Sequence, residues 1–175
     1  MKTYTVHLIR HAMTKENTEG KYIGQTDVEP TKEGLAQIKN LMDENEGYPY
    51  ADVVISSPLK RCTETAKLIY PEKEPVIMQD LIEYDFGDFE GMTADELKDL
   101  DTFKDWISGA HPEEPVPFGE SQKEFNDRIC KCFIRIIEGI IKSGTRSTAI
   151  ITHGGVIMSL MAAFAIPEAP MHEWL

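Results

Sequence analysis

The chain has 175 residues, of which 41% are hydrophobic and 27% charged, and its formal net charge is −12. This length suits one domain of ordinary globular composition, and so acidic a surface argues against nucleic acid or an anionic membrane as a partner. The N-terminus lacks the apolar core of a signal peptide, and no apolar run reaches the roughly 18 residues that span a bilayer. We therefore expect a cytoplasmic protein.

The first half of the chain alternates strand patterns with helix patterns. A helix is predicted to open at Pro30 and Thr31, because apolar residues follow at helical spacing. Ser57 and Pro58 are predicted to be the N-cap and first residue of a second helix, which runs to about Tyr70. The strands predicted in this half are 3–9, 52–56 and, as a shorter candidate, 76–78.

The second half begins with two capping boxes, which start at Thr93 and Ser121. The first opens a short helix, and the second opens a long helix with an apolar stripe along one side. A further short helical piece is predicted around Trp106, followed by a proline-rich loop over 109–119. The pattern ends with a strand over 147–152 and a helix that begins after Gly154 and Gly155 and runs through Met161.

Strands separated by helices predict an α/β fold, in the form of a three-layer sandwich. Its central sheet would be mostly parallel, with helices on both faces. In such sheets, ligands bind beyond the carboxyl ends of the strands. We expect one domain over residues 1–175.

Polar residues stand at the ends of three predicted strands. Arg10 and His11 follow the first strand, Arg61 lies in the helix after the second, and His153 and Gly154 follow the last. The carboxyl ends of parallel strands meet at one edge, so these residues should converge. Arginine binds phosphate oxygens bidentately, and helix N-termini offer free N–H groups. The sequence therefore predicts an anion site at this edge.

Each of these residues also has a purely structural interpretation. A histidine after a strand is often a structural group, and His153 with its glycines could form only a tight turn. His7 and His11 share one face of a strand but lie roughly 13 Å apart, too far to bind one ion. The cysteines, Cys62, Cys130 and Cys132, lack the C-x-x-C spacing of redox or zinc sites. We expect no metal and no cofactor.

The stretch LIRHAMT, residues 8–14, resembles the R-H-G-E-T signature of the histidine phosphatase (phosphoglycerate mutase-like) superfamily. Further stretches follow in the family's order. They are YIGQTD (22–27), PTKEG (30–34), SSPLKRCTETA (56–66), LIEYDFGDFEG (81–91), FGES (118–121) and THG (152–154). One such motif is weak evidence, but several in register are strong. The short, compact pattern is similar to the α-ribazole phosphatase and broad-specificity phosphatase branch.

The resemblance implies a phosphohistidine mechanism. Imidazole is largely neutral at pH 7 and nucleophilic, and the resemblance implies that His11 attacks phosphorus. It also implies that Arg10, Arg61 and His153 neutralise the phosphate oxygens, and that Glu83 is the general acid. Glu90 is a second, weaker candidate for that acid. The residues that the resemblance implies for substrate binding are Arg10, Asn17, Gln25, Thr26, Arg61, Glu83, His153 and Gly154.

Two features depart from the family pattern. Ala12 stands where glycine is usual, and it should be tolerated unless the backbone needs a positive φ there. Family members usually continue beyond the last predicted helix into a final strand, whereas this sequence stops at Leu175. A domain that lacks its C-terminal strand is therefore one expectation.

We predict a phosphatase that hydrolyses a small phosphomonoester. One alternative is a phosphoglycerate mutase-type phosphotransferase, which shares the catalytic residues but usually has longer insertions after the Arg61 motif. The other is a catalytically silent protein that binds phosphorylated ligands. Specificity should lie in residues 84–89 and 101–118. Five aromatic residues could line an apolar pocket there, with burial in the core as the alternative: Tyr84, Phe86, Phe89, Trp106 and Phe118. The natural substrate and the oligomeric state are not indicated by the sequence.

Overall fold

A parallel sheet of four strands forms the centre of the computed structural model, which describes residues 2–44 and 47–169. The strands are β1 (Thr5–Arg10), β2 (Val53–Ser56), β3 (Val76–Ile77) and β4 (Ser147–Thr152). Their order in the sheet is β1-β4-β2-β3, and every neighbouring pair is parallel. The predicted strands are confirmed, and the carboxyl ends of all four lie at one edge.

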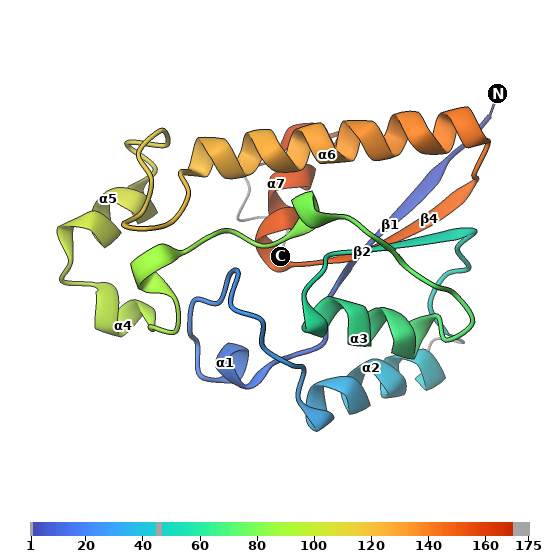
Figure 1. Cartoon of the computed structure of the whole chain (residues 1–175), viewed down its shortest axis with the longest axis horizontal. Coiled ribbons are helices and arrows are strands. Elements are labelled where there is room, and N and C mark those ends of the chain that lie inside the picture. The colour runs from blue at the N-terminus through green and yellow to red at the C-terminus, as the bar shows by residue number, and fades with distance from the viewer. Residues whose placement is uncertain (1, 45–46, 170–175) are drawn as a thin grey trace.

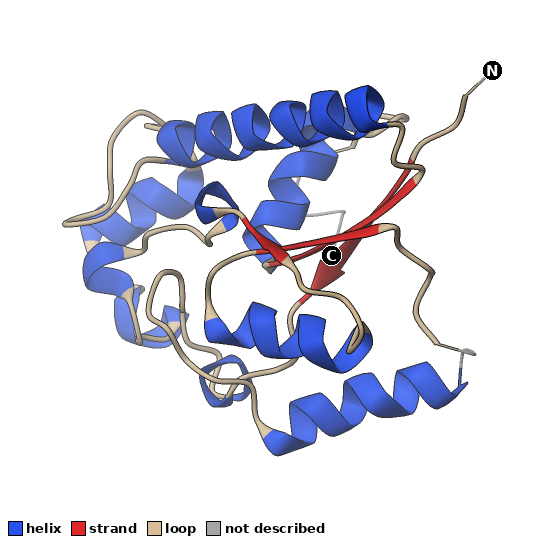
Figure 2. Cartoon of the chain, turned by 45° about the vertical axis from the view of Figure 1, so that its right-hand side comes forward, coloured by secondary structure: helices blue, strands red, loops and turns tan. Residues whose placement is uncertain are grey.

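Helices cover both faces of the sheet (Figure 1). One face carries α2 (Lys32–Glu44) and α3 (Lys60–Ile69), and the other carries α6 (Gln122–Ser143) and α7 (Gly154–Phe164). Alternation along the buried strands explains this arrangement, because successive side chains point to opposite faces. In β4, Ala149 and Ile151 pack with α2 and α3, whereas Ile150 packs with α6 and α7. The predicted three-layer α/β fold is therefore confirmed, as Figure 2 shows from a second side.

Short elements extend the molecule beyond the strand ends. They are α1 (Lys15–Thr18), α4 (Ala94–Leu97), α5 (Asp101–Ser108) and two 3₁₀ turns, Gln79–Leu81 and Gly87–Phe89. A group of aromatic rings in contact joins several of them to α6, with centroids 5.0–6.1 Å apart; its members are Tyr22, Tyr84, Phe86, Phe89, Phe103, Trp106 and Phe125. Among the described residues, no helix combines the length and apolar character needed to cross a membrane.

The predicted start of α3 was wrong. Ser57 and Pro58 do not open the helix, which begins at Lys60 after Leu59. The Ser57 hydroxyl lies 2.8 Å from His153 Nε2 and is therefore engaged across the sheet edge. The helix is capped instead by a residue from a distant loop, since the Lys60 N–H donates to Asp27 Oδ1 at 2.8 Å. A tertiary contact has replaced the local cap.

Both predicted capping boxes are confirmed, and the one at the start of α6 is buried. The Glu124 N–H donates to Ser121 Oγ at 3.1 Å, and the Ser121 N–H donates to Glu124 Oε2 at 2.9 Å. Ser121 is 1% exposed, so water could not take the place of its hydroxyl if the side chain were removed. The cap therefore fixes where the longest helix begins.

We expect Ser121→Ala to lower the free energy of unfolding by about 1 kcal/mol, because it leaves an N–H of α6 without its acceptor. For a chain of this size, the midpoint of thermal unfolding should fall by about 2–4 °C. Ser143→Ala is the control, since that serine is exposed at the other end of α6. An equal shift in both variants would show that the cap contributes nothing specific.

Candidate active site

The three polar strand ends meet at the carboxyl edge of the sheet. The sheet hydrogen bonds continue one residue past the strands, because the His11 N–H donates to Thr152 O at 2.9 Å and the Ser57 N–H donates to Ile151 O at 3.0 Å. This extension places His11, Ser57 and His153 side by side. The two imidazole rings lie edge to face, with centroids 5.2 Å apart. The predicted convergence is therefore present.

His11 is held as a neutral imidazole with one nitrogen free. Its Nδ1 lies 2.7 Å from Ala12 O, a contact that assigns the ring proton to Nδ1. Nε2 has no hydrogen-bond partner among the described residues and keeps its lone pair. Burial lowers the pKa of His11 to about 4, assisted by the charges of Arg61 and Arg10 and opposed by the Ala12 carbonyl. A neutral imidazole of this kind can act as a nucleophile.

Ala12, which stands in place of the usual glycine, fits this arrangement. Its side chain is buried, its φ is not positive, and its N–H donates to Thr65 Oγ1 at 2.8 Å. Alanine is therefore accommodated without strain, as expected.

Arg61 is a buried cation without a carboxylate in contact. The residue is 1% exposed and lies in the first turn of α3. Its guanidinium donates to the carbonyls of Thr26 (2.9 Å) and Gly24 (2.6 Å) and to His153 Nδ1 (3.3 Å). None of its described contacts is an ion pair, so its positive charge is not neutralised by contact. Such a charge makes the edge of the sheet attractive to an anion.

His153 is also neutral, and both of its ring nitrogens are in use. Nδ1 accepts from Arg61 Nε, which assigns the ring proton to Nε2, where it can be donated to Ser57 Oγ. Burial, followed by the charges of Arg61 and His11, keeps the pKa of His153 well below its ordinary value. His153 therefore orients Arg61 in this state, and a hydrogen bond from it to phosphate would have to replace one of these contacts.

The carboxylate of Glu83 lies against the start of α7, and the residue is 8% exposed. Its two oxygens accept from the N–H groups of Tyr84 and Gly155, each at 2.9 Å. Burial raises the pKa of this carboxyl, and the two hydrogen bonds and the charges of Arg61 and Arg10 only partly oppose that effect. Gly155 leaves room for this carboxylate, because a Cβ there would lie 2.5 Å from Glu83 Oε1 and would force the side chain to move. Sequence reasoning selected Gly154 and missed this role of its neighbour.

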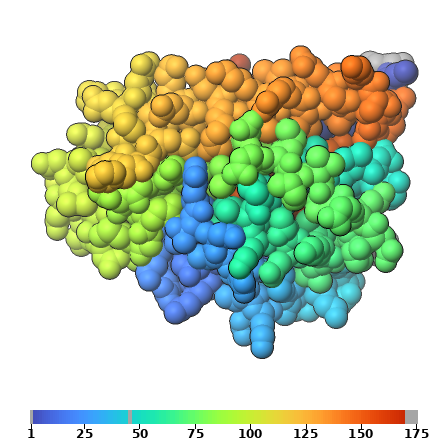
Figure 3. All heavy atoms as spheres, viewed as in Figure 1, coloured from blue at the N-terminus to red at the C-terminus, as the bar shows by residue number. Residues whose placement is uncertain are grey.

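Glu90 holds the loop that faces Arg61. Its Oε1 accepts from the N–H groups of Gly24 (2.9 Å) and Gln25 (3.0 Å), and its Oε2 accepts from the Thr26 hydroxyl (2.8 Å). The loop has no room for another residue at Gly24, where a Cβ would lie 1.7 Å from Tyr84 O. Both oxygens of Glu90 are therefore bound to this one loop, which gives Glu90 a structural role in holding it. In Figure 3 the blue N-terminal segment lies between the green surface of α3 and the yellow-green surface of α4.

Arg10 and Asn17 lie beside His11. They line, with His11, a cavity of about 410 Å³ that is bounded by α2. Arg10 is exposed and donates no hydrogen bond to a described residue, so its guanidinium is available to a ligand. Asn17 Oδ1 accepts from the Thr14 N–H at 3.1 Å, which leaves the amide NH₂ as a donor. Gln25 is exposed, and the Thr26 hydroxyl is already donated to Glu90.

A second cavity, of about 330 Å³ and lined by aromatic rings, opens beside Glu83 and Gly155. Three of the five aromatic residues suggested by the sequence line it, namely Tyr84, Phe86 and Trp106. The other two do not, because Phe89 is buried in the core and Phe118 is 91% exposed. Tyr22 and Phe125 complete the aromatic part of the lining, and sequence analysis missed them because they lie outside the two segments expected to set specificity.

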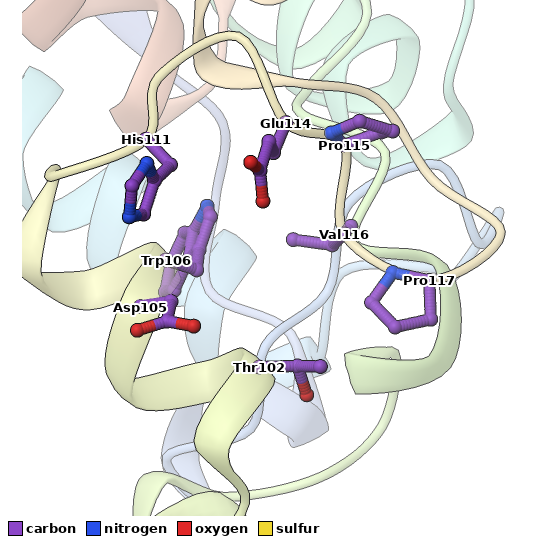
Figure 4. A pocket seen from close by; sticks show the side chains of 8 residues that line it. All are labelled: Thr102, Asp105, Trp106, His111, Glu114, Pro115, Val116 and Pro117. Carbon is purple, nitrogen blue, oxygen red and sulfur yellow. The ribbon is translucent and has the colours of Figure 1, made fainter.

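A separate cavity of about 70 Å³ lies on the other side of Trp106 (Figure 4). Residues of α5, including Asp105, face His111 and Glu114 of the following loop across it. Its lining residues include neither His11 nor His153. Within the part of the chain that the structure describes, no three His, Cys, Asp or Glu side chains are grouped so that they could hold a metal ion.

Comparisons with known proteins identify the family of this chain. The sequence profile of the histidine phosphatase superfamily (branch 1) matches residues 6–174. An adenosylcobalamin/alpha-ribazole phosphatase from Escherichia coli is 30% identical over 89% of this chain and 76% of its own length. A 2,3-bisphosphoglycerate-dependent phosphoglycerate mutase from Rhizobium etli is 26% identical over 89% of this chain and 78% of its own length.

Solved structures give the same result. The alpha-ribazole phosphatase from Shigella flexneri superposes with a TM-score of 0.78 at 27% identity, over 97% of this chain and 82% of its own. The resemblance inferred from the motifs is therefore confirmed across nearly the whole sequence. The chain belongs to the histidine phosphatase superfamily.

Proposed function

We propose that the protein hydrolyses small phosphomonoesters in two steps, through a phosphoryl group carried on His11. The observation that carries this proposal is the pairing of a neutral imidazole, whose Nε2 is free, with a buried Arg61 that has no carboxylate in contact. The first group supplies a nucleophile, and the second attracts the phosphate that it attacks.

In the first step, the lone pair of His11 Nε2 forms a bond to phosphorus while the ester P–O bond breaks. The electron pair of that bond remains on the leaving oxygen. Arg61, which is held in place before the reaction begins, and Arg10 stabilise the charge on the non-bridging oxygens. Glu83 is protonated before this step and transfers its proton to the leaving oxygen, which departs as an alcohol.

In the second step, water attacks the phosphorylated histidine. Glu83, now a carboxylate, takes a proton from that water as the new P–O bond forms. The P–N bond breaks, its electrons return to Nε2, and inorganic phosphate leaves. The site has then regained its starting state, with Glu83 protonated and His11 neutral.

The aromatic cavity favours hydrolysis over the mutase alternative. It begins at Glu83, so the alcohol part of the substrate would lie there. Among the described residues that line it there is no Lys, Arg or His, and the charged member is Glu83 itself. A phosphorylated sugar acid would bring a carboxylate into this place without a cation to receive it. An uncharged, partly apolar alcohol fits better.

We expect His11→Ala to abolish release of nitrophenol from p-nitrophenyl phosphate, with a loss of roughly 10³-fold or more, since the nucleophile is removed. The thermal midpoint should stay close to that of the wild type. His7→Ala is the matched control. His7 lies in β1, which ends just before His11, and its ring contacts Ser147 rather than the site. A His11→Ala enzyme that keeps most of its rate would rule out this nucleophile, and an inactive wild type would favour a silent binding protein.

With an alkyl phosphate, the pH dependence of kcat/KM should be bell-shaped, with its acid side set by His11 and its alkaline side set by Glu83. His11 must be unprotonated to attack, so its pKa of about 4 keeps it active down to that pH. Glu83 must be protonated to donate, so its raised pKa extends activity upward, and the rate falls as pH rises above that pKa. Glu83→Gln should flatten the descending side. Superimposable profiles for the two enzymes would contradict the assignment, because substrate ionisation is common to both.

Glu83→Gln should slow alkyl phosphates far more than p-nitrophenyl phosphate in single-turnover measurements. An alkoxide needs a proton to leave, and loss of the acid should cost about 10²–10⁴ in rate, whereas nitrophenolate leaves without one. Glu90→Gln is the comparison. It loosens the loop that holds Arg61 and should slow both substrates by similar factors. The reverse pattern would make Glu90 the acid.

A further inference from the structure

Glu83 is carried by a segment with little regular structure of its own. Residues 82–85 follow the short turn Gln79–Leu81 and precede the turn Gly87–Phe89. The carboxylate accepts one of its two hydrogen bonds from the N–H of the next residue, Tyr84. The orientation of the acid therefore depends on the orientation of the peptide that follows it. Something outside the segment must fix that peptide.

Arg128 of α6 contacts the carbonyl of this peptide and two carbonyls that precede it. Its Nη1 donates to the carbonyls of Asp80 and Ile82, both at 2.9 Å, and its Nη2 lies 3.4 Å from Glu83 O. The guanidinium also lies over the Phe125 ring, 5.3 Å from its centroid, which restricts its position further. One side chain thus contacts three backbone carbonyls within four residues of chain that end at the acid.

Glu120 holds the two residues that follow Glu83, namely Tyr84 and Asp85. Its Oε1 accepts from the Asp85 N–H at 2.9 Å, its own N–H donates to Asp85 O at 3.1 Å, and its carbonyl accepts from the Tyr84 hydroxyl at 2.6 Å. Glu120 and Arg128 are bound to each other, with Nη2 and Oε1 2.6 Å apart and Nε and Oε2 3.4 Å apart. Their side chains are only 15% and 21% exposed, so water screens this ion pair poorly.

We propose that the Glu120–Arg128 pair is a positioning device that aims Glu83 at the leaving oxygen. The proposal rests on the assignment of Glu83 as the general acid. Neither residue touches the phosphate site, and both act through the backbone on either side of Glu83. A displaced acid transfers its proton less well, and misplacement by about 1 Å can cost about 10²-fold in rate. The phosphate side is held separately, by Glu90 and the loop at Gly24.

Loss of the pair should therefore reproduce the selectivity of an acid mutant. Arg128→Met retains the length and apolar contacts of the side chain but cannot bind the carbonyls. We expect single-turnover rates with an alkyl phosphate to fall by about 10- to 100-fold, and those with p-nitrophenyl phosphate to change much less. Glu120→Gln keeps an acceptor for the Asp85 N–H but loses the ion pair, so its effect should have the same direction and be smaller.

A double mutant separates positioning from a general loss of stability. In a Glu83→Gln background no proton is donated, so adding Arg128→Met should leave the ratio of alkyl to aryl rates unchanged. Arg135→Met is the matched control. Arg135 lies on the same helix and pairs with the Asp80 side chain at the surface, without touching the backbone around Glu83. Its removal should leave both rates within about twofold of wild type, since surface pairs contribute little.

The outcomes distinguish this proposal from the one on which it depends. Equal slowing of both substrates by Arg128→Met and by Glu120→Gln, or additive effects in the double mutant, would overturn the positioning role. If Glu83→Gln itself shows no preference between the substrates, the acid assignment fails first. Should Arg128→Met fail to fold, Glu120→Gln and Arg128→Lys carry the same test, because both retain most of the packing.

Discussion

Arg61 places a positive charge inside the protein without a carboxylate in contact. Burying an uncompensated ion is expensive, so the groups around it must supply what water no longer does. The carbonyls of Gly24 and Thr26 and the Nδ1 of His153 meet that need. The loop that bears the carbonyls is in turn fixed by Glu90. Much of the arrangement beyond the sheet edge follows from the presence of this one guanidinium.

The same charge sets the state of the two histidines. It disfavours the imidazolium form of both His11 and His153, and it adds to the larger effect of burial. A neutral His11 is what nucleophilic attack requires, and an unneutralised cation is what binding of phosphate requires. Glu83 experiences the opposite balance, because burial raises its pKa more than the nearby cations lower it. One environment thus favours a neutral base and a neutral acid together.

The sequence was sufficient to predict the architecture and the principal members of the site. The carboxyl ends of parallel strands lie at one edge of the sheet, so Arg10, His11 and His153 could be placed there from their positions at strand ends. The capping boxes at Thr93 and Ser121 were predictable for a different reason, because the partner of each cap is only three residues away. What a residue does locally is readable from its neighbours in the chain.

Contacts between distant segments could not be predicted in this way. Ser57 was expected to cap a helix, but its hydroxyl is engaged by His153, and Asp27 takes over the cap. Glu90 was considered only as a second candidate for the acid, and its role in holding the loop became visible with its three donors. Arg128 gave no signal, because its partners are backbone carbonyls about 46 residues earlier in the chain. These interactions depend on the packing of the finished fold rather than on local pattern.

The central claim is that phosphate passes through a covalent bond to the enzyme. The stereochemical course at phosphorus tests it most directly, with a phosphorothioate ester made chiral by its sulfur and two oxygen isotopes and hydrolysed in water that carries the third. Each in-line displacement inverts the configuration, so attack by His11 followed by attack by water should give overall retention. Overall inversion would mean that water attacks the ester directly, and it would contradict the account given for His11.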